Sequence, residues 1–312
     1  MDSPPFIAGN PASISAHRNR MRALRSLYDE KPLTEGMTFD LAIKSPASSS
    51  FVDNKRNLPP FSPIYDLNSR FSLCSPLQSG TGFHSQVWLA HSLSLTADHH
   101  VPLVFKFIIP SFLKLPTTDL QEIHIIDGMY LHPNDSVAYE VAAYEKLWQF
   151  QGSSIPYFYG VHDITMPWGE KAYLLVLEYI IGPPLADLQT AIDSEAEGPA
   201  TKYYRDYETY HTLFHKALDT VRAAHSKGVY HVDITERNIL LDEENDRPVF
   251  IDWQNVTIPW AIGPGAEVNP YIVQECQDIQ QLLLAFFDSK CHNRRLVKYV
   301  KDELPDVYEY LG

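Results

Sequence analysis

The sequence predicts an α+β protein with two lobes, a strand-rich lobe followed by a helical one. Residues 71–180 consist of short apolar runs bounded by glycine, proline and aspartate, which is typical of strands. After Gly182 the apolar residues recur at helical spacing, most clearly over 208–228. The chain has 312 residues, the length of about two domains. Strands followed by helices favour an α+β architecture, with lobes over 71–180 and 181–312.

Residues 1–70 carry runs of proline, serine and asparagine without a sustained apolar period, so we expect a largely disordered extension. Within it, residues 17–28 predict a short helix with arginines on one side and Met21 and Leu24 on another. We interpret this helix as solvated or docked on a protein partner, with a targeting role as the alternative.

One helix interrupts the strands of the first lobe, because Val137, Val141, Tyr144 and Trp148 recur at helical spacing. We expect it over 137–150. A second helix within the later lobe is predicted over 277–287.

Composition excludes several function classes. The formal net charge of −14 repels polyanions, so we expect neither nucleic acid nor an anionic membrane as a general partner. No apolar run reaches the length of a membrane span, and the first ten residues lack a secretory pattern. Three widely spaced cysteines form neither a disulfide framework nor a zinc motif. We expect an intracellular protein, cytoplasmic or nuclear.

The residues that carry chemistry lie in 229–253. A strand-like run, a polar turn and a second strand-like run lead into Asp252, which places Asp233, Asn238 and Asp252 beside one hairpin. Carboxylate and amide oxygens are the ligands that Mg²⁺ takes in proteins, and phosphate usually completes its shell. The segment therefore predicts phosphate transfer.

This segment resembles the protein-kinase-like superfamily. The run His231 to Asn238 matches the catalytic loop HRDxxxxN, and Asp252 matches the aspartate of DFG, 19 positions after Asp233. Upstream, 80–87 resembles GxGxxGxV with Ser85 in place of the third glycine, and Val104-Phe105-Lys106 resembles the end of VAIK.

Glu140 supplies a partner for Lys106. It lies on the apolar side of its predicted helix, where an unpaired carboxylate is unfavourable. In the resemblance it matches the glutamate that holds the strand lysine against the phosphates. The run 172–185 resembles the fifth strand and hinge, with Leu177 as gatekeeper and Glu178 to Ile180 offering backbone groups to adenine.

The resemblance implies a phosphotransferase that uses ATP and Mg²⁺ and moves the γ-phosphate to a hydroxyl. The catalytic residues implied are Asp233, Lys106, Glu140 and Arg237, and the metal ligands are Asn238 and Asp252. The residues implied to contact the nucleotide are Gly80, Thr81, Gly82, Ser85, Val87, Val104, Lys106, Leu177, Glu178, Ile180 and Leu240. Asp278 resembles the buried aspartate that braces the catalytic loop.

The sequence departs from the family pattern at several positions. Val232 replaces the arginine that reads a phosphorylated activation loop, and Trp253-Gln254 replaces Phe-Gly after Asp252. Only 60 residues follow Asp252 without an Ala-Pro-Glu motif, so we expect a shortened helical lobe. The family implies a serine, threonine or tyrosine hydroxyl of a protein as the acceptor. The alternatives are a small-molecule kinase of the aminoglycoside or choline kinase type, and a pseudokinase that serves as a nucleotide-binding scaffold.

Overall fold

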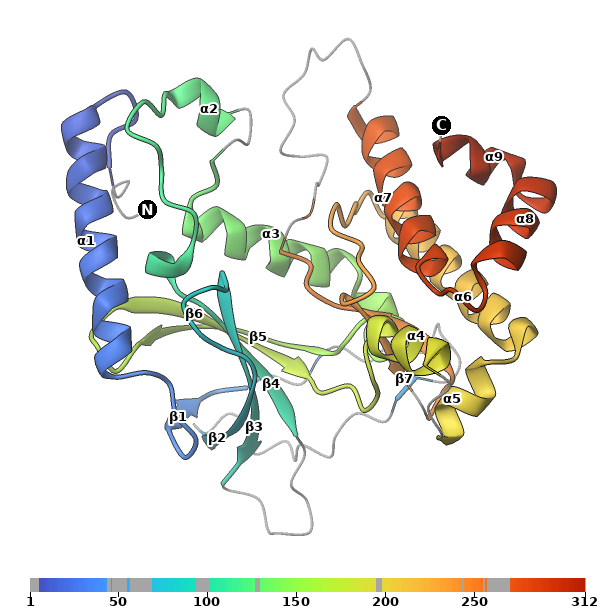
Figure 1. The fold of residues 1–312 in the computed structure, drawn as a ribbon. Coiled ribbons are helices and arrows are strands. Elements are labelled where there is room, and N and C mark those ends of the chain that lie inside the picture. The colour runs from blue at the N-terminus through green and yellow to red at the C-terminus, as the bar shows by residue number, and fades with distance from the viewer. Residues whose placement is uncertain are drawn as a thin grey trace. The chain divides into compact units, whose positions relative to one another are not determined.

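The computed structural model describes residues 6–43, 46, 55–56, 69–93, 102–126, 130–194, 198–242, 244–254, 256 and 270–311. The chain divides into two compact units (Figure 1). Unit 1 comprises Met1–Pro46, Leu58–Ala138 and Phe158–Tyr179. Unit 2 comprises Ala47–Asn57, Tyr139–Tyr157 and Ile180–Gly312.

Unit 1 is built on a six-stranded antiparallel sheet in the order β1-β2-β3-β4-β6-β5. Strand β4 lies between β3 and β6, and five of its six residues are buried, Lys106 among them. The strands are β1 (Thr38–Leu41), β2 (Ser69–Gln78), β3 (Ser85–Ser92), β4 (Leu103–Ile108), β5 (Phe158–Thr165) and β6 (Lys171–Glu178).

Helix α1 (Pro11–Glu30; Figure 1) packs on the rest of unit 1 through Tyr28, whose ring contacts Phe112 and Trp168. The side chain of Asn10 accepts a hydrogen bond from the Ser13 amide and so caps the helix, and proline occupies the first turn, where its missing N–H costs nothing. Ile14, Met21 and Tyr28 recur at seven-residue spacing on one face and are buried.

The predicted extension therefore differs from the structure over residues 11–41. We expected disorder apart from a short helix over 17–28, whereas α1 runs for 20 residues and β1 pairs with β2. The physical reason is local. The proline- and serine-rich runs lower the mean hydropathy of the first 70 residues, but the helical stripe buries its own apolar face. The prolines and serines of 44–45 and 47–54 lie outside the described residues.

Between β4 and β5 the chain forms the short helical segments η3 and α2, and the longer helix α3. Helix α3 (Pro133–Lys146) begins earlier and ends earlier than the predicted 137–150, and a separate 3₁₀ turn, η4 (Trp148–Phe150), follows it. Residues up to Ala138 belong to unit 1 and the rest of the helix to unit 2. The segments are η3 (Pro110–Phe112) and α2 (Glu122–Ile126).

Unit 2 is mainly helical and carries one two-stranded antiparallel sheet, β7 (Ile239–Asp242) with β8 (Arg247–Phe250). Its core lies where α6 meets α7, since the Tyr210, Phe214 and Phe286 rings pack at centroid distances of 5.5 to 5.6 Å. The helices are α4 (Leu185–Asp193), α5 (Pro199–Tyr204), α6 (Tyr207–Ser226), α7 (Pro270–Phe287), α8 (Asn293–Glu303), α9 (Pro305–Tyr308) and the 3₁₀ turn η6 (Glu309–Leu311).

The α+β class is thus confirmed: an antiparallel sheet is followed along the chain by helices. Within the described ranges, no helix has both the length and the apolar character needed to cross a membrane.

Candidate functional site

The loop from His231 to Asn238 carries the predicted catalytic aspartate and closes on itself. The side-chain amide of Asn238 donates a hydrogen bond to the Asp233 carbonyl at 3.0 Å, and the Asn238 backbone N–H donates to the Thr235 carbonyl at 3.0 Å. The five-residue separation of Asp233 and Asn238 is therefore bridged directly, and the two predicted site residues lie together.

The same loop is tied to the segment that enters Asp252. The Ile251 N–H donates to the Asn238 carbonyl at 3.0 Å, and His231 Nε2 lies 2.9 Å from the Ile251 carbonyl. The His231 ring also packs on Trp253 at 4.5 Å between centroids. Because Ile251 immediately precedes Asp252, these contacts place the segment that carries Asp252 beside the 231–238 loop.

The backbone of this site is strained. Val232 has φ 62° and Asp252 has φ 62°. The left-handed region disfavours most side chains and especially a β-branched one. Residues held there cost of order 1 to 3 kcal/mol each and persist where the surroundings fix them. The strain at these two positions therefore requires partners that hold the loop.

Helix α7 supplies those partners. Asp278, which is 1% exposed, accepts hydrogen bonds from the His231 N–H at 2.8 Å, the Val232 N–H at 2.7 Å and His225 Nε2 at 2.9 Å. Gln281 accepts from the Ile234 N–H at 2.7 Å and donates to the Val232 carbonyl at 3.2 Å. The strained turn is thus held by two side chains one helical turn apart.

The Tyr144 phenol of α3 is fully buried in unit 2. Burial raises the pKa of Tyr144 well above its ordinary value, and the carboxylates of Glu140 and Asp252 raise it further. Glu140 is fully buried in α3. The Glu140 and Asp252 carboxylates thus both act electrostatically on the buried Tyr144 phenol.

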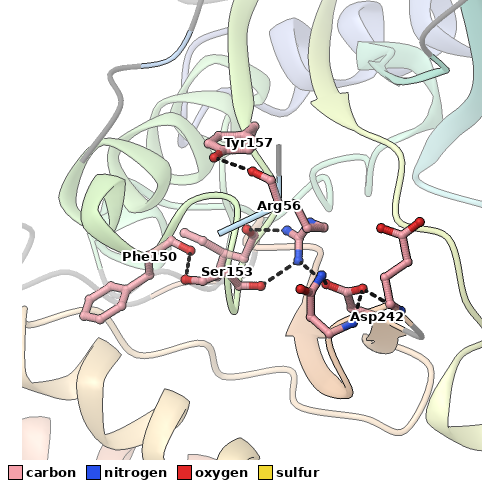
Figure 2. A network of polar contacts seen from close by, with 8 residues as sticks. Arg56, Phe150, Ser153, Tyr157 and Asp242 are labelled. Atoms are coloured by element: carbon pink, nitrogen blue, oxygen red, sulfur yellow. Dashed lines mark hydrogen bonds and ion pairs between the residues drawn. The ribbon is translucent and has the colours of Figure 1, made fainter. Parts of the chain in front are cut away.

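A buried ion pair anchors the hairpin formed by β7 and β8 (Figure 2). The Arg56 guanidinium donates to Asp242 Oδ2 at 3.0 Å, to the Ser153 carbonyl at 2.7 Å and to the Ile155 carbonyl at 3.1 Å. Tyr157 in turn donates to the Arg56 carbonyl at 3.0 Å. The last residue of β7 is thereby fixed to the segment that follows α3.

In unit 1, the predicted glycine-rich turn connects β2 to β3. Gly80 has φ 104°, which favours glycine. The Gln86 side chain, fully buried, accepts from the Gly80 N–H at 2.7 Å and donates to the Gly80 carbonyl at 2.9 Å. Tyr28 of α1 donates to the same Gln86 oxygen at 3.3 Å. A Cβ built at Gly80 or Gly82 would meet nothing within 4 Å, so the space beside this turn is open.

Lys106 is buried in β4 at 4% exposure, paired across the sheet with Val87 and Leu175. Val87 and Val104 are half-buried on the neighbouring strand positions. Lys106 belongs to unit 1 and Glu140 to unit 2, and their pairing stays a prediction.

The remaining predicted residues are distributed over both units. Leu177 and Glu178 end β6 in unit 1, both buried. In unit 2, Ile180 is buried and Leu240 of β7 bridges to Pro184. Arg237 is exposed and has no ion-pair partner among the described residues. Around the glycine-rich turn, Thr81 is half-buried, and Ser85 is buried with its hydroxyl 3.4 Å from Gln78 Nε2.

One comparison with curated proteins is informative. Over 76 residues the chain is 38% identical to CBL-interacting serine/threonine-protein kinase 8 of Arabidopsis thaliana. The resemblance to the protein-kinase-like superfamily is confirmed. The matched part is 24% of this chain and 15% of that kinase. The similarity therefore supports the superfamily but does not identify a specific activity. No family model matches the chain.

The kinase-like donor set fits Mg²⁺ in its chemistry. Asn238 and Asp252 offer an amide and a carboxylate oxygen, and Mg²⁺ commonly takes one or two carboxylates and leaves its other positions to water and phosphate. In the part of the chain that the structure describes, no group of three or more His, Cys, Asp or Glu side chains is arranged to hold a metal.

Three supporting residues escaped the sequence analysis: Gln86, Gln281 and Arg56. Gln281 and Arg56 act on segments 47 and 186 residues away along the chain, whereas Gln86 holds the nearby turn at Gly80. Gln281 carried a usable signal, because it lies three positions after Asp278 on the same face of α7. Tyr144 was recognised as a position of the helical stripe but not as a neighbour of the candidate site.

Proposed function

We propose that this chain is a protein-kinase-like phosphotransferase that uses ATP and Mg²⁺ and transfers the γ-phosphate to a hydroxyl group. The observation that carries the proposal is the loop from His231 to Asn238, held in a strained conformation by Asp278 and tied through Ile251 to Asp252. In this proposal unit 1 corresponds to the strand-rich lobe and unit 2 to the helical lobe.

In this mechanism Asp233 orients the acceptor hydroxyl and accepts its proton, while Asn238 and Asp252 hold the metal. When bound, Mg²⁺ neutralises charge on the phosphate oxygens. Lys106 binds the phosphates and Glu140 positions the Lys106 ammonium, because a lysine buried in a strand needs an anionic partner. Arg237, exposed beside the loop, would contact the phosphate or the acceptor.

The proposed nucleotide contacts in unit 1 begin at the glycine-rich turn. The open turn at Gly80 and Gly82 lets backbone N–H groups approach phosphate oxygens, since no side chain stands there. The base would rest on apolar side chains and take hydrogen bonds from the chain after β6. The contact residues proposed are Gly80, Thr81, Gly82, Ser85, Val87, Val104, Lys106, Leu177, Glu178, Ile180 and Leu240.

The acceptor that we propose first is a hydroxyl of a protein. The relative's name marks it as a serine/threonine-protein kinase, and we propose a protein hydroxyl for this chain too. A small-molecule acceptor is the second possibility. The third is a pseudokinase scaffold, favoured by three departures from the family pattern: Ser85, Val232 and Gln254. An intact set of Lys106, Glu140, Asp233, Asn238 and Asp252 favours the enzyme.

The test measures ADP release and transfer of labelled γ-phosphate with MgATP, first as autophosphorylation and then with peptide and small-molecule acceptors. We expect Asp233→Ala to lower transfer by about 10²- to 10⁴-fold, the usual contribution of a positioned proton acceptor. Asp187→Asn, an exposed carboxylate of α4, is the matched control and should transfer phosphate at the wild-type rate.

A second measurement separates the enzyme from the scaffold. ATP at about 100 times Kd stabilises a folded protein by about 2.7 kcal/mol, which raises the melting temperature by several degrees. We expect this rise to require Mg²⁺ and to disappear in Asp252→Asn. A shift without turnover in any assay would favour the pseudokinase, and the absence of both would contradict the nucleotide site itself.

A further inference from the structure

Two histidines on α6 face one another in unit 2, outside the candidate kinase site. His211 and His215 are separated by one helical turn, so their side chains lie on one face. Their Nε2 atoms are 3.1 Å apart, and His215 Nε2 is 3.0 Å from the Tyr299 hydroxyl of α8. The Tyr299 ring lies 4.1 Å from the His211 ring between centroids. His215 Nε2 therefore lies within hydrogen-bonding distance of both the second imidazole and the phenol oxygen.

The spacing of these donors matches the coordination shell of a small transition metal. Zn²⁺ binds imidazole nitrogen at about 2.0 to 2.1 Å in tetrahedral geometry, which places neighbouring ligand atoms about 3.3 to 3.4 Å apart. The two observed separations, 3.1 and 3.0 Å, are within a few tenths of an ångström of that edge. Small rotations of the side chains would seat an ion between them.

The surroundings suit a cation. His211, His215 and Tyr299 are all half-buried, so an ion can reach them. Glu208 lies near His211, and Asp219 lies near His215, so two carboxylates stand close to the pair; Arg222 is the opposing charge near His215.

We propose that His211, His215 and Tyr299 form a binding site for a divalent transition-metal ion, with water in the fourth position. Imidazole suits zinc, copper and nickel better than magnesium. Such an ion would link α6 to α8 and stabilise the end of the chain that packs there. In the described ranges no three His, Cys, Asp or Glu side chains gather around a metal position, so this site depends on the phenol and water to complete its shell.

The experiment titrates the purified full chain, free of nucleotide and affinity tag, with ZnCl₂ by calorimetry and follows its melting temperature. We expect one high-affinity site that raises the melting temperature. His211→Ala and His215→Ala should each weaken Zn²⁺ at least about tenfold, because removing even an outer partner of a metal ligand costs that much. Tyr299→Phe should weaken it less. Thr212→Ala, an exposed neighbour on α6, should bind as the wild type does.

A second readout covers the case in which a variant is poorly folded. Cu²⁺ bound to the wild-type chain should give an electron paramagnetic resonance spectrum with coupling to two imidazole nitrogens, and the double variant H211A/H215A should lose it while circular dichroism stays unchanged. Equal Zn²⁺ affinity in the wild type and the double variant would overturn the proposal, as would the absence of binding at 1 mM Zn²⁺.

Discussion

Each unit contains a buried carboxylate that accepts three hydrogen bonds, Asp278 in unit 2 and Glu170 in unit 1, but the two carboxylates hold different kinds of segment. Asp278 in unit 2 accepts from two backbone N–H groups and one imidazole at 2.7 to 2.9 Å. Glu170 in unit 1 accepts from the Ser111 N–H, the Ser111 hydroxyl and the Trp168 indole, each at 2.8 Å. Both are at most 4% exposed, and both receive the dense hydrogen bonding that a buried carboxylate needs.

The two carboxylates differ in the backbone conformation of the segments that donate to them. Asp278 holds a turn in which Val232 has φ 62°, next to the proposed catalytic aspartate. Glu170 holds η3, just after β4, to the start of the β6 strand, where no backbone strain of this kind occurs among the described residues. One carboxylate therefore stabilises a conformation that the chain would not adopt unaided, and the other joins segments already in favourable conformations. Their removal should separate stability from activity.

The largest effect is expected from Asp278→Ala. Three buried donors would lose their acceptor, and breaking a buried charged network in this way costs about 3 to 5 kcal/mol. We expect urea unfolding of the variant to show that loss, and hydrogen exchange to place it in the 231–238 loop and α7. A loss below about 1 kcal/mol would mean that the loop is held by Gln281 and packing instead.

The ion pair of the neighbouring hairpin comes next. Arg56→Ala would leave the Asp242 carboxylate, 3% exposed, and two carbonyls without their guanidinium. The Asn245 side chain still donates to Asp242 at 2.9 Å, so we expect a loss of about 2 to 3 kcal/mol. Arg56→Lys, which keeps the charge but not the fork, should lose about half as much. Unfolding curves of the two variants test the order; equal losses would indicate that charge alone matters.

The matched amide variants sharpen the comparison between the two carboxylates. Glu170→Gln and Asp278→Asn each replace one acceptor by an amide N–H₂, so one buried donor is left unpaired in either unit at a cost of about 1 to 3 kcal/mol. The stability losses should be similar. Phosphotransfer should fall about 10²-fold in Asp278→Asn alone, because a small displacement of the reacting groups costs that much. Equal activity of both variants would show that Asp278 has no positioning role.

Sequence patterns predicted the architecture where local chemistry decides it. The buried strand with Lys106 and the amphipathic stripe of α6 follow from apolar periodicity, and both are present. The helix over 11–30 was underpredicted, since its stripe is interrupted by arginines and lies in a segment whose average composition favours disorder. What buries its face is the rest of unit 1, which no local pattern contains.

The candidate site divides in the same way. Asp233, Asn238 and Asp252 were placed together from their spacing around a hairpin, and the contacts through Ile251 link their segments. Arg56 was not predicted, because its partners lie 97 and 186 residues away along the chain, and loops of that length leave the partner undetermined until the fold is known. Gln86 was not predicted although its partner Gly80 is only six residues away, because its pattern is that of an ordinary strand residue.

The smallest predicted effect is a pH response that belongs to unit 1. Burial, then Arg20 and His132, lower the pKa of His17 below its ordinary value of 6.5. Between these two values the unfolded chain binds a proton that the folded chain does not, so stability is complete above pH 6.5 and falls as the pH is lowered. The slope of the unfolding free energy against pH cannot exceed about 1.4 kcal/mol per pH unit for one proton.

Other histidines respond in the same direction, so the measurement is the difference between the wild type and His17→Phe, which keeps a ring against Phe6. We expect the urea midpoint of the variant to fall less than that of the wild type between pH 7.5 and 5.5. Parallel curves would show that His17 binds a proton equally in the folded and the unfolded chain, and that its charge does not affect the docking of α1.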